Sequence, residues 1–253
     1  MLSEERRRAI LNMIQHEGRV LVKELAEKLK TSPITIRKDL EELHTEGLLH
    51  RTHGGALLRR TGAWFDPARG EKEKRHSKEK LRIASAAAQM VQAGQSVVLD
   101  AGPTSTEIAR ALHTVRDLTI ITNAVNIAAE LAGSPADVIL TGGTLRRNSF
   151  SLVGPLAEES LRKLSADLFF LAVDGFDPEF GVTTPDLLEA KVNRVMMEIA
   201  RETIVVCDSS KFGERTLSLI APTSAIRRVI TDNQIGKTDL QALREAGITV
   251  KLV

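Results

Sequence analysis

Five short polar segments of the chain carry the residue types that bind small oxygen-rich molecules. Each follows an apolar run, and together they are Asp100-Ala-Gly-Pro-Thr-Ser-Thr106, Thr122-Asn123, 141–148, 174–184 and 208–213. They contain carboxylates, amides, hydroxyls and glycines, which donate to and accept from a polar ligand or let the backbone approach it closely. The chemistry that they indicate is recognition of a small polar metabolite.

The first segment is the best phosphate-binding candidate. It passes from an apolar run through Gly102 into a helical pattern whose first turn holds Thr104, Ser105 and Thr106. A helix N-terminus offers unpaired N–H groups and the positive end of a dipole, which favour an anion. Thr and Ser also serve as plain helix caps, so that alternative stays open. The segment lacks the glycine and lysine patterns of nucleotide sites, which favours a phosphorylated metabolite over a nucleotide.

The other segments add countercharge and hydrogen-bonding groups. Lys211 is a candidate for the charge that neutralises a phosphate, whereas Glu189 and Lys191 lie two apart on one expected helix and face different neighbours. Arg146 and Arg147 reach this site, a neighbouring subunit or solvent. The full set of expected effector-binding residues is Asp100, Gly102, Thr104, Ser105, Thr106, Asn123, Gly142, Gly143, Asp174, Gly175, Glu189, Lys191 and Lys211.

The order of apolar runs predicts the scaffold that brings these segments together. Runs rich in Val, Ile and Leu fall at 96–100, 118–122, 137–141, 168–174, 203–208, 228–231 and 248–253, with helical patterns at 104–113, 124–131, 156–164, 187–201 and 238–246. Short runs without polar alternation are typical of a mainly parallel sheet covered on both faces, a doubly wound α/β domain. Because such strands end at one edge, we expect the segments to converge there.

The first 58 residues carry the pattern of a helix-turn-helix followed by a wing. Helical patterns cover 4–16 and 21–29, and Ser32 and Pro33 are good residues to cap and start a third helix that runs to about residue 46. A two-stranded wing is predicted over 48–58, turning at Gly54-Gly55. The alternative for this part is a small helical protein-interaction module.

The third helix is cationic on the exposed side of its first two turns and acidic after them. Ile36, Leu40 and Leu43 share one face and are expected to be buried. This polarity suits a helix whose N-terminal end enters the major groove of DNA, because phosphates repel the acidic end. The expected DNA contacts are Arg6, Arg7, Arg8 and Lys23 to phosphates, Ser32, Thr35, Arg37 and Lys38 on the third helix, and Arg51 and His53 in the wing.

Composition and charge agree with two parts that do different work. The chain has 253 residues, 42% of them hydrophobic, which is enough for a sizeable core. Residues 1–60 contain 12 Lys/Arg and 9 Asp/Glu, residues 61–80 contain 6 and 4, and residues 81–253 contain 17 and 20. A mildly basic head on a mildly acidic body suggests that the head meets an anionic polymer. We predict a DNA-binding domain over 3–58, a linker over 59–75 and an effector-binding domain over 76–253.

The remaining composition excludes several classes of protein. Cys207 is the single cysteine, which excludes an intramolecular disulfide framework and a multi-cysteine zinc site, and we expect it to be a small buried hydrophobe. No apolar run approaches the ~20 residues that cross a bilayer, and no signal-peptide core follows the charged N-terminus. We therefore expect a cytoplasmic protein without membrane association. In the linker, a helix is expected from about Glu71 to Val91, and Trp64 is expected to pin the linker onto the body.

Four motifs of the head are Arg7-Arg-Ala-Ile-Leu, Val22-Lys-Glu-Leu-Ala, Ser32-Pro-Ile-Thr-Ile-Arg-Lys-Asp-Leu40 and Arg51-Thr-His-Gly-Gly-Ala56. Together they resemble the winged helix-turn-helix of the DeoR family of bacterial sugar-metabolism repressors. Pro33-Ile34 stands where the family more often has an acidic pair.

The body is similar to the effector-binding half of the same family through Asp100-Ala-Gly-Pro-Thr-Ser-Thr-Glu-Ile-Ala, Thr122-Asn-Ala, Thr141-Gly-Gly-Thr-Leu-Arg-Arg, Val173-Asp-Gly-Phe-Asp and Asp208-Ser-Ser-Lys-Phe-Gly. Residues 140–154 and Gly181-Val-Thr-Thr look closest to members that control the use of N-acetylgalactosamine and galactosamine. Pro103 departs from the family's common Gly-Thr-Thr and removes one N–H donor.

The resemblance implies a fold related to ribose-5-phosphate and glucosamine-6-phosphate isomerases, and a DNA-binding repressor of a sugar operon. It also implies a double-stranded DNA operator, release by a phosphorylated sugar, a homo-oligomer (dimer or tetramer) and no cofactor. Two alternatives remain. Asp174, Asp177 and Glu189 are carboxylates suited to acid–base chemistry, so a sugar-phosphate isomerase or deaminase with a DNA-binding head is one. A metabolite-binding protein whose head contacts another protein is the other.

Overall fold

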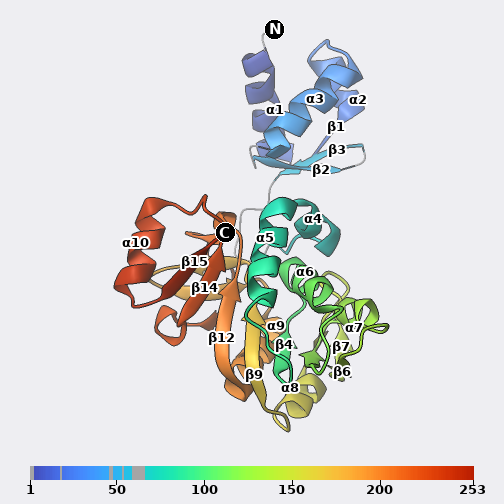
Figure 1. Cartoon of the computed structure of the whole chain (residues 1–253). Helices are drawn as coiled ribbons and strands as arrows, with labels where there is room; N and C mark the ends of the chain where they lie inside the picture. The colour runs from blue at the N-terminus through green and yellow to red at the C-terminus, as the bar shows by residue number, and fades with distance from the viewer. Residues whose placement is uncertain (1–2, 18, 46–47, 53, 59–65) are drawn as a thin grey trace. The chain divides into compact units, whose positions relative to one another are not determined.

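The computed structural model describes residues 3–17, 19–45, 48–52, 54–58 and 66–253. The chain divides into two compact units, Met1–Thr61 and Gly62–Val253, and each is described by itself (Figure 1). His53, expected in the wing, and Trp64, expected in the linker, lie outside the described residues. In the parts that the structure describes, no helix is both long and apolar enough to cross a membrane.

The first unit is three helices and a small antiparallel sheet. Its elements are α1 (Ser3–Glu17), β1 (Arg19–Leu21), α2 (Val22–Lys28), α3 (Pro33–Thr45), β2 (Leu49–Thr52) and β3 (Gly55–Leu58). The Ser32 hydroxyl accepts a hydrogen bond from the Thr35 amide at 3.1 Å, which confirms the predicted cap. The wing has a third strand, β1, which the sequence did not indicate, and the sheet order is β1-β3-β2.

Seven strands form the central sheet of the second unit. They are β4 (Ser96–Leu99), β5 (Thr119–Thr122), β6 (Asp137–Leu140), β9 (Ala166–Leu171), β12 (Ala200–Val206), β14 (Arg228–Thr231) and β15 (Thr249–Leu252). Their order is β15-β14-β12-β9-β4-β5-β6, and every neighbouring pair is parallel. The predicted doubly wound sheet is confirmed. The chain builds outward from β4 to β6 and then returns to β9 beside β4, so the direction of winding reverses between β4 and β9.

Helices cover both faces of this sheet (Figure 1). In β4, Val97 and Leu99 point into one apolar cluster and Val98 into the other, which is the alternation that a doubly covered strand requires. The first cluster includes α5 (Ser77–Ala88), α6 (Pro103–Leu112) and α7 (Val125–Glu130). The second includes α8 (Pro155–Leu161), α9 (Leu187–Ile199) and α10 (Lys237–Glu245). Cys207 is buried in that second cluster, as expected.

Two features differ from the sequence-based expectation. The single helix predicted from Glu71 to Val91 is two helices, α4 (Arg69–Lys74) and α5, because His76 adopts a left-handed backbone conformation with φ of 52° that no continuous helix accepts. A second antiparallel sheet, β10 (Gly175–Asp177), β11 (Gly181–Thr184) and β13 (Ser218–Ala221), and the hairpin β7 (Thr144–Leu145) with β8 (Leu152–Val153) arise from segments expected to be loops.

Candidate functional site

The first turns of α3 expose the cations that the sequence placed there. Ile36, Leu40 and Leu43 are buried, and Arg37 and Lys38 are exposed. In the described part of the chain no carboxylate forms an ion pair with either of these two side chains, whereas several other head arginines are paired. Lys23 on α2 and Ser32 are also exposed, and the half-buried Thr35 places its hydroxyl 2.8 Å from that of Ser32.

The acidic part of α3 is neutralised by arginines from other elements. The carboxylate of Glu42 lies 2.7 Å from the Arg7 guanidinium, and Glu41 forms an ion pair with Arg51 of the wing. Two residues expected to contact DNA therefore have partners within the head. The net positive charge of the α3 surface lies in its first turns as a result.

Arg6 has a structural role that the sequence did not indicate. Its Nε and Nη2 lie 2.5 Å and 2.9 Å from the two carboxylate oxygens of Asp39, which is 3% exposed in the middle of α3. The hydrogen bond to Asp39 raises the pKa of Arg6, although burial opposes it. This fork-shaped pair joins α1 to α3 and engages the guanidinium that was expected to grip a phosphate. Asp39 shares the helical face of Ile36, Leu40 and Leu43, so its spacing indicates burial although its charge does not.

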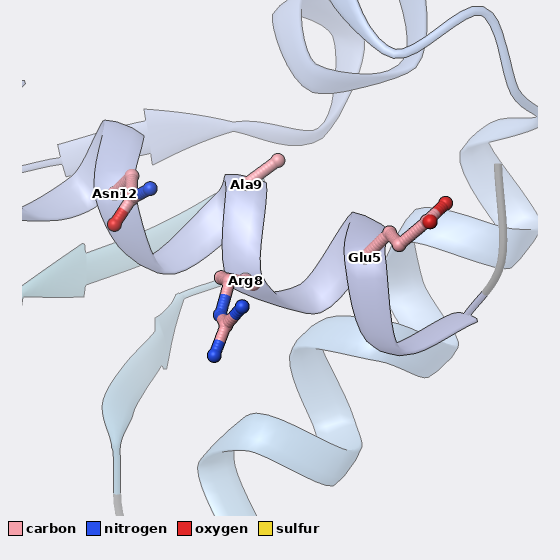
Figure 2. Close-up of a pocket in the computed structure, with 4 residues that line it drawn as sticks. All are labelled: Glu5, Arg8, Ala9 and Asn12. Atoms are coloured by element: carbon pink, nitrogen blue, oxygen red, sulfur yellow. The ribbon is translucent and has the colours of Figure 1, made fainter.

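Arg8 is the exposed member of the arginine run on α1. Figure 2 shows it beside a surface pocket whose described lining residues are Glu5, Ala9, Asn12 and Arg8 itself. These residues recur at helical spacing along one side of α1, and the side chains of Glu5 and Arg8 point away from one another (Figure 2). One helix face with diverging charges does not make a ligand site, and the pocket is remote in sequence from every effector candidate.

The expected effector residues converge in the second unit at the carboxyl ends of its strands. Across the reversal point, the Asp100 carboxylate that follows β4 accepts a 2.9 Å hydrogen bond from the Ala172 amide that follows β9. It also accepts from the Gly102 amide at 3.2 Å and from the Ser105 hydroxyl. Burial raises the pKa of Asp100 to about 7 against these hydrogen bonds. Asp100 therefore fastens the start of α6 to the end of β9.

The start of α6 is tightly packed and its hydroxyls are engaged. A Cβ at position 102 would lie 2.4 Å from the Cβ of Ala172, so the close approach of the two loops requires a glycine. The buried Ser105 hydroxyl donates to Asp100, and the Thr106 hydroxyl accepts from Asn126 at 3.1 Å. Thr104 is also buried. The N-cap residue of α6 is Gly102, which has no side chain, and Pro103 supplies no N–H, so this end offers an anion the helix dipole and the amides of Thr104 and Ser105.

We call the carboxyl ends of the strands of this sheet, with the loops that follow them, the rim. A network of ion pairs covers it. Arg146, which follows β7, places Nη1 2.6 Å from Glu189 and Nη2 2.7 Å from Asp66. Its Nε lies 3.3 Å from Asp186, the residue that caps α9. Glu189 also accepts a 2.7 Å hydrogen bond from the Ser151 hydroxyl. Arg146 is thus a member of the site, one of the three alternatives left open for it, whereas Arg147 is exposed.

Helix α4 contributes two further cations. Lys72 places Nζ 2.7 Å from Asp174 and 3.0 Å from Asp66, and Arg69 donates through Nη2 to the Thr106 hydroxyl at 3.4 Å. Burial lowers the pKa of Lys72, but Asp174 and Asp66 outweigh it and hold that pKa above its ordinary value. Burial likewise raises the pKa of Asp174, while Lys72 and Lys211 outweigh it and hold the pKa low. These groups are therefore charged at neutral pH.

The remaining candidates divide into members of the rim and residues elsewhere. Lys211 is close enough to Asp174 to affect its pKa, whereas Lys191 is exposed on another face of α9. The Asn123 side chain donates to the Leu152 carbonyl at 3.0 Å.

Three of the expected glycines lie at or near the rim. Gly142 and Gly143 follow β6, with φ of 130° at Gly143, and Gly175 begins β10, where a Cβ would lie 2.4 Å from a backbone oxygen. The backbone conformation at Gly143 and the close packing at Gly175 therefore favour glycine at these two positions whether or not a ligand binds.

Sequence reasoning missed Asp66, Arg69 and Lys72. They lie in the charge-rich stretch that was interpreted as a linker, and the spacing of charges there has no period that indicates contact with the rim. Three buried polar atoms near the rim, Asn123 Oδ1, Asn126 Oδ1 and Thr141 Oγ1, have no hydrogen-bond partner within the described residues. Across the same described residues, no group of three or more His, Cys, Asp and Glu side chains is arranged to hold a metal ion.

Comparison with known proteins gives matches to both units. The family described as "DeoR-like helix-turn-helix domain" matches residues 6–61, and that described as "DeoR C terminal sensor domain" matches residues 75–233. The chain is 39% identical over 253 residues to an "aga operon transcriptional repressor" of Escherichia coli O157:H7, with 99% of this chain and 94% of that protein covered. It is 37% identical over 250 residues to the "HTH-type transcriptional regulator GlpR" of Haloferax volcanii, with 99% and 98% covered.

Among solved structures, ribose 5-phosphate isomerase A of Methanocaldococcus jannaschii is similar over 54% of this chain and 54% of its own, with a TM-score of 0.40 and 16% identity.

Proposed function

The chain belongs to the DeoR family of transcriptional regulators, and from this premise we propose that it is a cytoplasmic repressor of a sugar catabolic operon, released from DNA by a phosphorylated sugar. The observation that carries the DNA-binding part is the pair of exposed cations, Arg37 and Lys38, in the first turns of a capped helix α3. These side chains reach base edges when the N-terminal end of α3 enters a major groove. Lys23 and Arg8 supply phosphate contacts.

The effector site of this proposal is the rim of the second unit. Asp174 and Glu189 place their carboxylates there beside Lys72 and Arg146, the buried Asp100 and Asn123 shape the site from beneath, and Gly102 with the hydroxyl residues 104–106 forms the start of α6. The oxygens of Asn123, Asn126 and Thr141 that have no partner within the described residues are buried, so they accept from a ligand hydroxyl or amino group only when the residues that cover them move. An amino sugar phosphate is the effector class that we favour, because residues 140–154 and Gly181-Val-Thr-Thr resemble those of family members that control the use of N-acetylgalactosamine and galactosamine.

The operator is double-stranded DNA with two-fold symmetry, and the second unit joins copies of the chain as a dimer or tetramer that sets the half-site spacing. The proposal includes no turnover. Asp174 and Glu189, the carboxylates that an isomerase would use, are held by Lys72 and Arg146. Measurable isomerisation or deamination of a phosphosugar, abolished by Asp174→Asn, would contradict this part.

The test is a filter-binding titration at several salt concentrations, with DNA fragments taken from upstream of the genes adjacent to the one that encodes this protein. We expect sequence-selective binding whose affinity falls steeply with salt, because each neutralised phosphate releases counterions. Galactosamine 6-phosphate and related phosphosugars are then added to the complex. A flat salt response without sequence preference would end the DNA-binding proposal. Binding that no phosphosugar weakens would end the effector proposal alone.

A further inference from the structure

A carboxylate of the chain itself bridges the two cations that cover the effector rim. Asp66 Oδ1 lies 3.0 Å from Lys72 Nζ, and Asp66 Oδ2 lies 2.7 Å from Arg146 Nη2. The side chains of Asp66, Lys72 and Arg146 are 12%, 18% and 17% exposed, so the bridge is largely removed from water. Arg146 and Asp66 are 80 residues apart in sequence. This bridge holds the start of the second unit on the rim.

The same two cations touch the carboxylates expected to face the effector. Lys72 pairs with Asp174, and Arg146 pairs with Glu189. Arg69, three residues before Lys72 in α4, donates to Thr106 at the start of α6, and α4 packs against α6 (Figure 1). The segment from Asp66 to Lys72 therefore lies across the rim, and its position depends on the pairing of Asp66.

A phosphate monoester and a carboxylate make the same kinds of contact with these groups. Both are anions with several oxygens, both accept paired N–H bonds from a guanidinium, and both attract an ammonium, but the phosphate carries more charge. The start of α6 offers partial charges only, because Pro103 has no N–H and the hydroxyls of Ser105 and Thr106 are engaged, whereas Lys72 and Arg146 each carry a full positive charge.

We propose that Lys72 and Arg146 form the subsite for the effector's phosphate, and that Asp66 occupies this subsite when the effector is absent. The inference rests on the proposed function, since it assigns the phosphate to particular side chains of that effector site. Phosphate and Asp66 exclude one another, so the protein has two arrangements of Asp66 and the residues beside it, while Lys72 stays on the rim. A ligand that binds only one of two arrangements shifts the population toward it. Because this segment follows the DNA-binding unit in the chain, the exchange supplies the differential affinity that release requires.

The test is isothermal titration of the full-length protein with inorganic phosphate, galactosamine 6-phosphate and unphosphorylated galactosamine. Asp66→Asn keeps the side-chain shape but removes the competing charge, and we expect it to bind both phosphate probes about tenfold more tightly than wild type, as removal of a competing state predicts. Lys72→Met removes a cation of the subsite and is expected to bind them at least tenfold more weakly. Galactosamine should show no such dependence on either substitution.

The matched control is Asp167→Asn, the same chemical change in an Asp that pairs with Arg201 and Ser96 at the amino ends of the strands, away from the rim. It is expected to leave phosphosugar affinity at the wild-type value. Hydrogen exchange provides a second readout that needs no variant. The amide of Arg69, which lies three residues after Asp66 and donates to the Asn148 carbonyl, should exchange faster in wild type when galactosamine 6-phosphate is added, and it should already exchange fast in Asp66→Asn.

The outcomes separate this inference from the proposed function. If wild type binds the phosphosugar but Asp66→Asn binds it equally or more weakly, or if the ligand slows exchange of the Arg69 amide, Asp66 is no competitor and the inference is overturned while the proposed function stands. If neither protein binds any phosphosugar, the proposed effector class and this inference fail together.

Discussion

The Nζ of Lys80 lies 2.5 Å from the carbonyl oxygen of Lys72 and also donates to the carbonyl of Arg75. Lys80 belongs to α5 and is 5% exposed, and the two carbonyls belong to the last turn of α4 and the residue after it. An ammonium at this end satisfies carbonyls that have no partner in the helix and complements the helix dipole. Lys80 thus holds the C-terminal end of α4 against α5, while Asp66 pairs with Lys72 of α4 at the rim.

This anchor has a pH dependence. Burial lowers the pKa of Lys80 to about 8, with Asp208 opposing and with Lys211 and Arg75 adding to the shift. An unfolded chain keeps its lysines protonated to a higher pH, so between pH 8 and about 10 the unfolded state binds more protons than the native state. Stability contributed at this position must therefore rise with pH in that window. We expect the unfolding free energy of wild type minus that of Lys80→Met to increase by on the order of 2 to 3 kcal/mol between pH 8 and 10.

Urea unfolding of both proteins at several pH values measures this difference, in which the titrating groups that do not interact with Lys80 cancel. A difference that stays constant or falls over the window would show that Lys80 is not buried as an ammonium.

Asp100 predicts the opposite slope in a more acidic range. Its pKa is raised by burial to about 7, whereas an unfolded Asp titrates near 4, so between these values the native state binds the extra proton. The stability contributed by Asp100 is present below pH 4 and lost as the pH rises through 7. Relative to Asp100→Asn, wild type is expected to lose up to about 4 kcal/mol between pH 4 and 7.5.

Asp167→Asn is the comparison for this experiment. A backbone hydrogen bond from Ser96 lowers the pKa of Asp167, so its contribution to stability is lost as the pH falls rather than as it rises. Slopes of the same sign for the two variants would contradict the assignment of a raised pKa to Asp100.

The pair of Arg6 and Asp39 is expected to be essential for the stability of the first unit. Asp39→Ala leaves a guanidinium that is 12% exposed without its fork-shaped partner, which typically costs about 3 to 5 kcal/mol. Urea unfolding and hydrogen exchange of the amides in α1 and α3 would register the loss. Glu41→Ala serves as the control, because the pair of Glu41 with Arg51 is more exposed and is expected to contribute below about 1 kcal/mol.

Arg37 and Lys38 should differ from Arg6 in what their removal changes. Arg37→Ala and Lys38→Ala are expected to leave the unfolding free energy within about 0.5 kcal/mol of wild type, because both side chains are exposed. Each should weaken DNA binding, by about 1 to 3 kcal/mol with relaxed sequence preference where the side chain reads a base. Arg201→Ala, at an exposed arginine of the second unit, should leave both the unfolding free energy and the DNA affinity near their wild-type values. Equal DNA affinity for all three variants would remove α3 as the reading helix.

Gly102 is expected to tolerate no side chain. A Cβ there meets the Cβ of Ala172 at 2.4 Å, and Ala172 is held by the hydrogen bond from its amide to Asp100. Gly102→Ala should therefore destabilise the second unit by about 1 to 3 kcal/mol and weaken phosphosugar binding. Gly133→Ala adds the same methyl group where nothing lies within 4 Å and should leave both quantities near their wild-type values. Thermal unfolding with and without galactosamine 6-phosphate compares the two.

The local pattern of the chain determined the elements and the edge of the sheet at which they work. The cap at Ser32, the buried face of α3 and the seven apolar runs depend on neighbours within a few residues, and all of them are found where the periodicity predicted. The convergence of Asp100, Asn123 and Asp174 followed from the same reasoning, because parallel strands that share a sheet end at a common edge.

Only the tertiary structure decided which charges meet. Arg6 and Asp39 are 33 residues apart, Asp66 and Arg146 are 80 apart, and neither pair leaves a periodic trace in the sequence. Arg6 was expected to hold a phosphate and instead joins two helices, and residues interpreted as a linker supply Lys72 and Arg69 to the rim. The physical reason is that helices and strands form from local backbone and solvent preferences, whereas an ion pair depends on the packing of the whole unit, which brings distant side chains within hydrogen-bonding distance and removes them from water.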